Sequence, residues 1–165
     1  MDWFDDWALT LAVFTPLVGM AIVLLIPRAE EAAIKVVALL TSLVTLAIGV
    51  GILVDFDFGN TAKMQFQVDK EWIPVINARY HLGIDGISLP LLILTMVIVP
   101  LCIIYSLDHF PEPHNPKAFL ALILLLEVGM IGTFVALDLV LFFIFFEVVL
   151  LPMFFMIGVW GGENR

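Results

Sequence analysis

The chain has 165 residues, of which 62% are hydrophobic and 14% are charged, and its mean hydropathy is +1.12. Soluble domains are roughly 45–50% apolar and about 25% charged, so this composition excludes a soluble enzyme and indicates an integral membrane protein. The net charge of -9 argues against nucleic-acid binding, which needs clustered basic side chains. With the single cysteine Cys102 and no Cys/His cluster, the sequence predicts neither an internal disulfide nor a metal site.

Five apolar runs are long enough to cross a bilayer as helices, which requires about 20 mostly apolar residues. They cover residues 7–26, 34–54, 87–107, 117–137 and 139–160. The segment before the first run lacks the basic residues of a secretory signal. The sequence therefore predicts an all-α polytopic membrane protein with one membrane domain over residues 1–165.

The loops between these runs differ in character. The long connection, residues 55–86, contains two stretches, 64–69 and 79–85, in which apolar and polar residues alternate. Alternation with period two favours strands, so we expect either a short β-hairpin on the membrane surface, turning near residues 71–77, or an irregular loop. Only Asp138 separates the last two runs, which predicts a tight antiparallel helix pair with Asp138 as the cap of the second helix. Asp85 is predicted to cap the third helix in the same way.

Basic residues near helix ends predict the orientation, because cytoplasmic loops carry an excess of Lys and Arg. With the N-terminus outside, Arg28, Lys35, Lys117 and Arg165 all lie on the cytoplasmic side. His114 lies in the proline-rich loop 108–116 on that side and is predicted to be a solvated residue.

Glu147 is the only ionisable residue in the run 139–160. A carboxyl group at bilayer depth costs at least ~2.5 kcal/mol, and such residues mark ion or proton paths and face a bundle interior. We therefore predict that Glu147 transfers protons; the alternative is an acid that only hydrogen-bonds a neighbouring helix. Pro152 follows five residues later and leaves the Val148 carbonyl without its helical N–H partner.

Glu127 is the second candidate, ten residues into the run 117–137. If the fourth and fifth helices pack antiparallel, the carboxyl groups of Glu127 and Glu147 lie at similar heights and can face one cavity and share protons. The alternative is again a hydrogen bond to a neighbouring helix. No lysine lies inside any run, so a basic partner for Glu147 has to come from elsewhere.

The stretch from Phe142 to Gly161 contains Phe-Glu147, Leu-Pro152-Met and Trp160-Gly. It resembles the fifth helix of the antiporter-like M subunit of respiratory complex I, called chain 4 in mitochondria. Residues 81–89, His-Leu-Gly-Ile-Asp-Gly-Ile-Ser-Leu, and residues 136–143 resemble the start of that family's third helix and its junction between helices four and five.

The resemblance implies a place in the proton-pumping membrane arm of NADH:quinone oxidoreductase, in a bacterial plasma membrane or a mitochondrial inner membrane. It implies that Glu147 pairs with a lysine on a later helix and helps to drive proton transfer. NADH, FMN, iron–sulfur clusters and quinone are expected in other subunits and no cofactor in this chain, whose expected partners are the lipid bilayer and neighbouring antiporter-like subunits. Family members have many more helices, so the resemblance implies either the N-terminal part of a longer subunit or a gene product that is complete only beside another chain.

Two other functions fit the same features. A subunit of a multisubunit cation/proton antiporter or of a membrane-bound hydrogenase also carries the buried glutamate. A membrane scaffold without transport chemistry also fits a chain with five helices.

Overall fold

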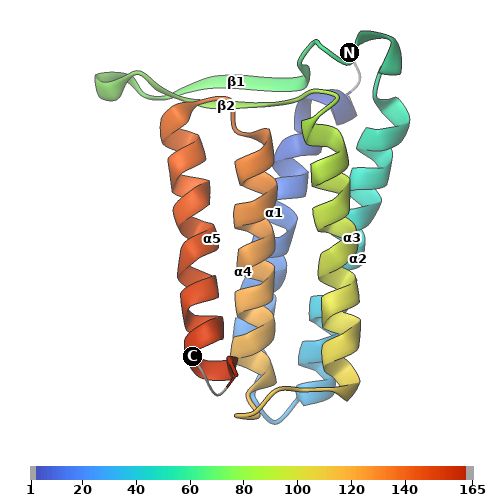
Figure 1. Ribbon diagram of the computed structural model, residues 1–165, viewed down its shortest axis with the longest axis vertical. Coiled ribbons are helices and arrows are strands. Elements are labelled where there is room, and N and C mark those ends of the chain that lie inside the picture. The colour runs from blue at the N-terminus through green and yellow to red at the C-terminus, as the bar shows by residue number, and fades with distance from the viewer. Residues whose placement is uncertain (1–2, 163–165) are drawn as a thin grey trace.

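The fold is a bundle of five long helices with a two-stranded sheet across one end (Figure 1). The structure is a computed structural model that describes residues 3–162. Its main elements are α1 (Trp3–Leu25), α2 (Glu31–Asp55), β1 (Gln65–Ile73), β2 (Ala78–Ile84), α3 (Ser88–Asp108), α4 (Pro116–Val135) and α5 (Leu139–Trp160). The prediction of an all-α membrane architecture with a short hairpin is confirmed.

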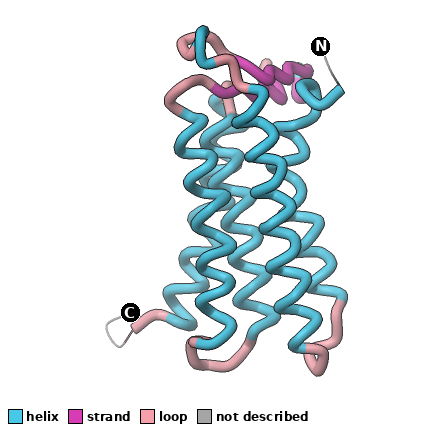
Figure 2. The backbone as a smooth tube through the Cα atoms, turned by 90° about the vertical axis from the view of Figure 1, so that its right-hand side faces the viewer, coloured by secondary structure: helices cyan, strands magenta, loops and turns pink. Residues whose placement is uncertain are grey.

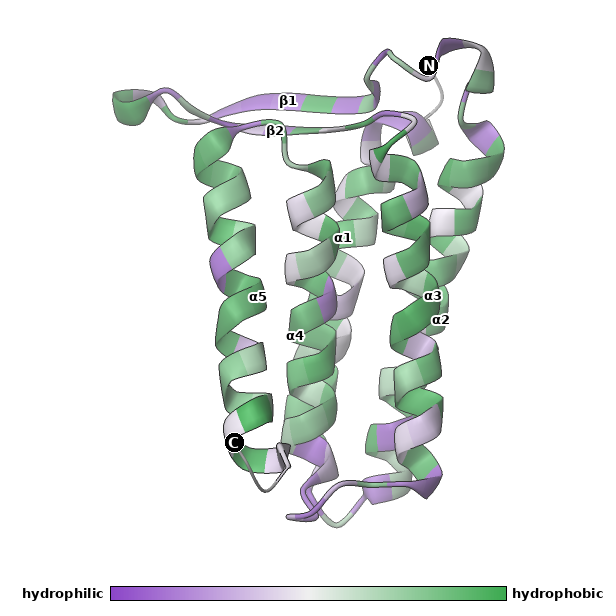
Figure 3. Cartoon of the chain, viewed as in Figure 1, coloured by the Kyte–Doolittle hydropathy of each residue, from purple (hydrophilic) through white to green (hydrophobic). Residues whose placement is uncertain are grey.

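All five helices have the length and composition of membrane spans. The shortest, α4, has 20 residues, and 20 residues at 1.5 Å each match a hydrocarbon core of about 30 Å. Figure 3 shows that hydrophobic residues cover the shafts of the helices and that hydrophilic residues gather mainly at the two ends. The chain is therefore an integral membrane protein.

The helix boundaries follow local signals. α1 begins at Trp3, four residues before the predicted start. Asp5 and Asp6 lie in its first turn, where negative charge is favourable beside the helix dipole. α5 spans residues 139–160 as predicted, and the Asp138 carboxylate accepts hydrogen bonds from the N–H groups of Val140 and Leu141. Asp85 accepts from the N–H groups of Ile87 and Ser88 at the start of α3. Both predicted capping roles are confirmed.

The hairpin lies across the ends of the helices (Figures 1 and 2). β1 and β2 are antiparallel, with Asp69 opposite His81, and Asn77 takes up the left-handed conformation at the turn. The hairpin is fastened to the turn between α4 and α5, because the N–H of Leu137 donates to the carbonyl of His81. The N–H of Arg79 donates to the Asp138 carboxylate, 3.2 Å away. Asp138 therefore joins the cap of α5 to the sheet.

α4 is the central helix and α5 the peripheral one. α4 packs against α1, α2, α3 and α5, whereas α5 packs mainly against α4 and also touches β2. In the most apolar 18 residues of each helix, 56% are buried in α4 and 17% in α5. The described bundle therefore leaves most of α5 uncovered.

Candidate functional site

Glu147 lies on the uncovered side of α5. The buried residues of that helix are Leu141, Phe145 and Pro152. At about 100° per residue, Glu147 lies about 200° around the helix from Phe145, and its side chain is exposed. The expectation that Glu147 faces a bundle interior is wrong for the five described helices, because the helix that covers one side of α5 lies opposite this carboxyl group.

The depth of Glu147 is as predicted. It lies eight residues after the start of α5, about 12 Å along the axis, near the middle of a span. Pro152 is inside the helix, one turn after Val148, so the Val148 carbonyl lacks its i+4 N–H partner. An acid and a freed carbonyl therefore lie within one turn of each other at mid-depth, where polar groups require partners.

Glu127 has the opposite environment. Its side chain is fully buried in α4, and neither carboxylate oxygen has a hydrogen-bond partner within the described residues. The alternative that Glu127 hydrogen-bonds a neighbouring helix therefore finds no support among residues 3–162. Burying an uncompensated charge costs far more than burying a neutral acid.

The two acids lie at similar depth but on opposite sides of the α4–α5 contact. Glu127 is eight residues before the end of α4, and Glu147 is eight residues after the start of α5. The α4 face that touches α5 contains Gly129 and Gly132, since a side chain at either position would meet Val149 or Phe145. Glu127 lies about 200° from Gly129 around the helix and points away from α5. The structure does not bring the two carboxyl groups into one cavity.

Asp138 is the most connected acid outside the spans. The N–H groups of Leu141, Arg79 and Val140 donate to its carboxylate and hold its pKa below the usual range, against the opposing effect of desolvation. On β2, the Arg79 guanidinium donates to Asp69 at 2.7 Å and lowers the pKa of that carboxyl group. These contacts stabilise the hairpin and its attachment, and they account for both acids.

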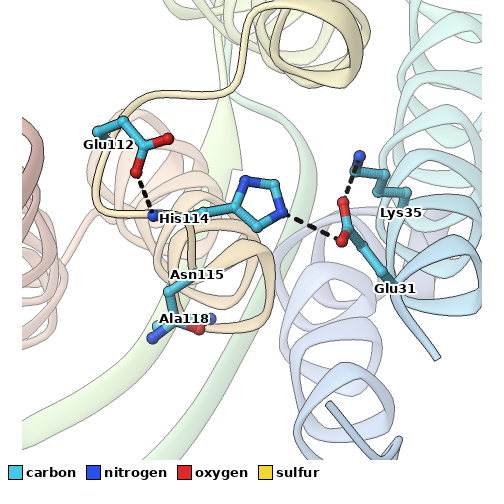
Figure 4. Close-up of polar contacts among 6 residues, drawn as sticks. All are labelled: Glu31, Lys35, Glu112, His114, Asn115 and Ala118. Atoms are coloured by element: carbon cyan, nitrogen blue, oxygen red, sulfur yellow. Dashed lines mark hydrogen bonds and ion pairs between the residues drawn. The ribbon is translucent and has the colours of Figure 1, made fainter. Parts of the chain in front are cut away.

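The opposite end of the bundle holds a polar cluster that the sequence did not reveal (Figure 4). The Glu31 carboxylate lies between the ammonium group of Lys35, at 2.6 Å, and Nε2 of His114, at 3.1 Å. The backbone N–H of His114 donates to Glu112. The His114 side chain is half-exposed, in agreement with the prediction of a solvated residue, but its contact with Glu31 was not predicted. Its contact joins residues far apart in the chain, and no local pattern signals it.

Two further hydrogen bonds join this end of the bundle around the loop between α3 and α4. The ammonium group of Lys117 donates to the carbonyl of Ile26 at 2.7 Å, beyond the end of α1. The indole N–H of Trp160 donates to the carbonyl of Pro113 at 2.8 Å. Residues from α2, α4 and α5 therefore close this end of the bundle.

Residues 3–162 contain no group of three or more His, Cys, Asp or Glu side chains that could hold a metal ion.

Comparison with known proteins identifies the family. Residues 11–133 match the model of NADH-ubiquinone oxidoreductase chain 4, amino terminus. The chain is 39% identical over 153 residues to NADH-ubiquinone oxidoreductase chain 4 of Arabidopsis thaliana, covering 93% of this chain and 30% of that protein. It is 38% identical over 162 residues to NADH-quinone oxidoreductase subunit M of Rickettsia conorii, covering 95% of this chain and 32% of that protein.

A relative named for another electron donor is similar to the same degree. The F(420)H(2) dehydrogenase subunit M of Methanosarcina mazei is 38% identical over 156 residues, which are 94% of this chain and 30% of that protein. The chain thus spans about 30% of the length of the relatives that it matches. With most of its residues inside the family model, the chain belongs to the family of NADH-ubiquinone oxidoreductase chain 4 and corresponds to the amino-terminal part of its members.

Proposed function

We propose that this chain is the amino-terminal part of a membrane subunit of NADH:quinone oxidoreductase, and that Glu147 takes part in proton translocation. The names of its relatives and the five membrane spans support this assignment. Electron transfer from NADH to quinone, with FMN and iron–sulfur clusters, belongs to other subunits in this proposal. The partners are other membrane subunits of the complex, including neighbouring antiporter-like subunits.

The environment of Glu147 is the observation that carries the proposal. An acid on an uncovered helix face at mid-depth would meet lipid in an isolated bundle, which is costly. A basic group on a helix outside these five would compensate it. No Lys or Arg among residues 3–162 lies deep inside a span: Arg28, Lys35 and Lys117 lie near helix ends, and Lys63, Lys70 and Arg79 lie in the connection between α2 and α3 that contains the hairpin. An acid and a base that face each other at mid-depth can exchange protons as their charges change.

Glu127 has the second role in this proposal. Its carboxyl group is buried inside the bundle without a partner among the described residues, so in this proposal it exchanges a proton only when a partner or water reaches it. Because Glu127 points away from α5, its proton transfer would be separate from that of Glu147. The hairpin end and the N-terminus lie outside in the proposed orientation, and the end with Arg28, Lys35 and Lys117 lies on the cytoplasmic side.

The test is NADH-driven proton pumping in membrane vesicles that contain the assembled complex. Glu147→Gln keeps the shape of the side chain but cannot carry a proton, so we expect pumping to be lost while assembly on a native gel is intact. Glu71→Gln changes an exposed acid on the hairpin and is the matched control. Unchanged pumping in Glu147→Gln would overturn the proton-transfer role and favour a scaffold.

A second candidate differs only in the electron donor. The similarity to a subunit of an F(420)H(2) dehydrogenase favours a complex that accepts electrons from F(420)H(2) in place of NADH. Supplying each donor in turn to the same vesicles separates the two. Pumping that follows a sodium gradient and needs neither donor would instead indicate a cation/proton antiporter.

A further inference from the structure

A cavity at the end of the bundle opposite the hairpin combines basic side chains with an apolar wall. Its volume is about 400 Å³, and its lining includes Arg28, Glu31, Ile34, His114, Asn115 and Lys117. It is formed by the loop between α1 and α2, the start of α2, and the loop that leads into α4. Because α1 ends here and α2 and α4 begin here, the cavity lies at the level of the membrane interface.

The charges that line the cavity leave positive groups available. The guanidinium of Arg28 is exposed and has no hydrogen bond or ion pair with another described residue. Lys117 uses one of its three N–H donors on the carbonyl of Ile26. The one acid in the lining, Glu31, is already held between Lys35 and His114 (Figure 4). An anion in the cavity would therefore meet Arg28 and Lys117 without facing an unpaired carboxylate of the lining.

Apolar side chains also lie in the wall of the cavity and near it. Ile34 is buried in its wall, and Leu25, three residues before Arg28, is 84% exposed. A ligand that suits both features has an anionic head and apolar chains. A free phosphate ion satisfies the basic groups only, whereas a phospholipid also covers the exposed apolar end of α1.

We propose that this cavity binds the phosphodiester head of an anionic phospholipid, with Arg28 and Lys117 as its ligands and the acyl chains along the end of α1. Basic pockets between transmembrane helices on the cytoplasmic side are suited to such heads, because anionic lipids are enriched in that leaflet. The site is independent of the proton-transfer role of Glu147. It places one lipid between the loops that join α1 to α2 and α3 to α4.

The experiment uses the protein purified from membranes with its partners, stripped of lipid in detergent and then titrated. The probes are phosphatidylglycerol, phosphatidylcholine and inorganic phosphate, and the readouts are bound lipid by native mass spectrometry and the temperature of unfolding. We expect phosphatidylglycerol to bind and to raise the unfolding temperature. Phosphatidylcholine and inorganic phosphate should do neither at the same concentration.

The variants assign the binding to the cavity. Arg28→Gln together with Lys117→Gln should weaken phosphatidylglycerol binding roughly 30-fold, the effect of two basic side chains at about 1 kcal/mol each. Arg28→Gln alone should weaken phosphatidylglycerol binding roughly five-fold by the same reasoning. This single variant tests the site even if loss of the hydrogen bond from Lys117 to Ile26 disturbs the end of α1. Lys63→Gln, an exposed lysine at the other end of the bundle, is the matched control. The proposal is overturned if Arg28→Gln binds like the wild type, or if Lys63→Gln loses as much. If inorganic phosphate raises the unfolding temperature as much as phosphatidylglycerol does, the cavity is a site for a soluble anion, and the proposal is also overturned.

Discussion

Glu127 and Glu147 are two carboxyl groups on adjacent helices at similar depth, and the structure treats them in opposite ways. Glu127 is sealed inside the bundle without a partner, whereas Glu147 faces away from all the described helices. The difference follows from the places of their helices, because α4 is surrounded and α5 is packed on one side. Depth in the membrane therefore does not define the environment of an acid; the side of the helix on which it lies does.

Placing a lysine at each position is the strongest way to test this comparison. Glu127→Lys puts an ammonium group into a closed interior, where the effective penalty is on the order of several kcal/mol for an unpaired ion. Glu147→Lys in the same chain should cost less, about 3 kcal/mol on insertion scales for a helix centre, because an uncovered lysine can extend its head toward the interface. We expect Glu127→Lys to lose most of its accumulation in membranes and Glu147→Lys to retain a substantial part.

The measurement is the amount of inserted chain that stays monodisperse in detergent on gentle heating. Glu127→Gln is the control for the buried position, since it keeps the shape of the side chain and adds no charge. Equal losses in the two lysine variants would show that both positions are enclosed to the same degree, contrary to the structure.

The two faces of the α4–α5 pair offer a second, smaller test. A methyl group at Gly132 would overlap the ring of Phe145, whereas one at Gly158 meets nothing within 4 Å. Gly132→Ala should therefore lower stability by about 1–3 kcal/mol through overpacking. Gly158→Ala should raise it by about 0.5–1 kcal/mol, because alanine is the better helix residue.

Thermal unfolding of the two variants in detergent provides the comparison. Phe145→Leu combined with Gly132→Ala should recover part of the loss, because the two residues are in contact and their effects are not additive. If Gly132→Ala is as harmless as Gly158→Ala, α4 and α5 do not approach each other closely at Gly132.

Local features of the sequence predicted the elements but not the sides of the helices. Run length defined the five spans, alternation defined the hairpin, and Asp138 and Asp85 were found at the helix starts that they cap. The shafts are apolar on every side, so hydrophobic periodicity does not tell which face is buried. The outward position of Glu147 could not be derived for that reason. The contact between His114 and Glu31 depends on the packing of loops, which no short stretch of sequence encodes.

Substitution of Asp138 should have the smallest effect on stability. Asp138 extends the comparison to an acid outside the spans, whose carboxylate has its hydrogen-bond donors within the described residues. Its folded-state pKa is lowered, chiefly by the N–H groups of Leu141, Arg79 and Val140, so the charged form stabilises the fold. That contribution is complete above the ordinary aspartate pKa of about 3.9 and is lost as the pH falls through the lowered folded value. Asp138→Asn keeps an oxygen acceptor for the cap but carries no charge.

We therefore expect the wild type to unfold at a slightly higher temperature than Asp138→Asn at neutral pH, and the gap to close in acid. Asp138→Ala should lie below both at neutral pH, because it loses the cap of α5 and the bond to Arg79. Asp55→Asn, at the end of α2, controls for the loss of one negative charge, since the exposed Asp55 carboxylate has no hydrogen bond or ion pair with another described residue. A gap that stays constant with pH would mean that the charge of Asp138 is irrelevant to the fold. The hydrogen bonds that a neutral side chain accepts at this position would then be enough for the cap and for the contact with Arg79.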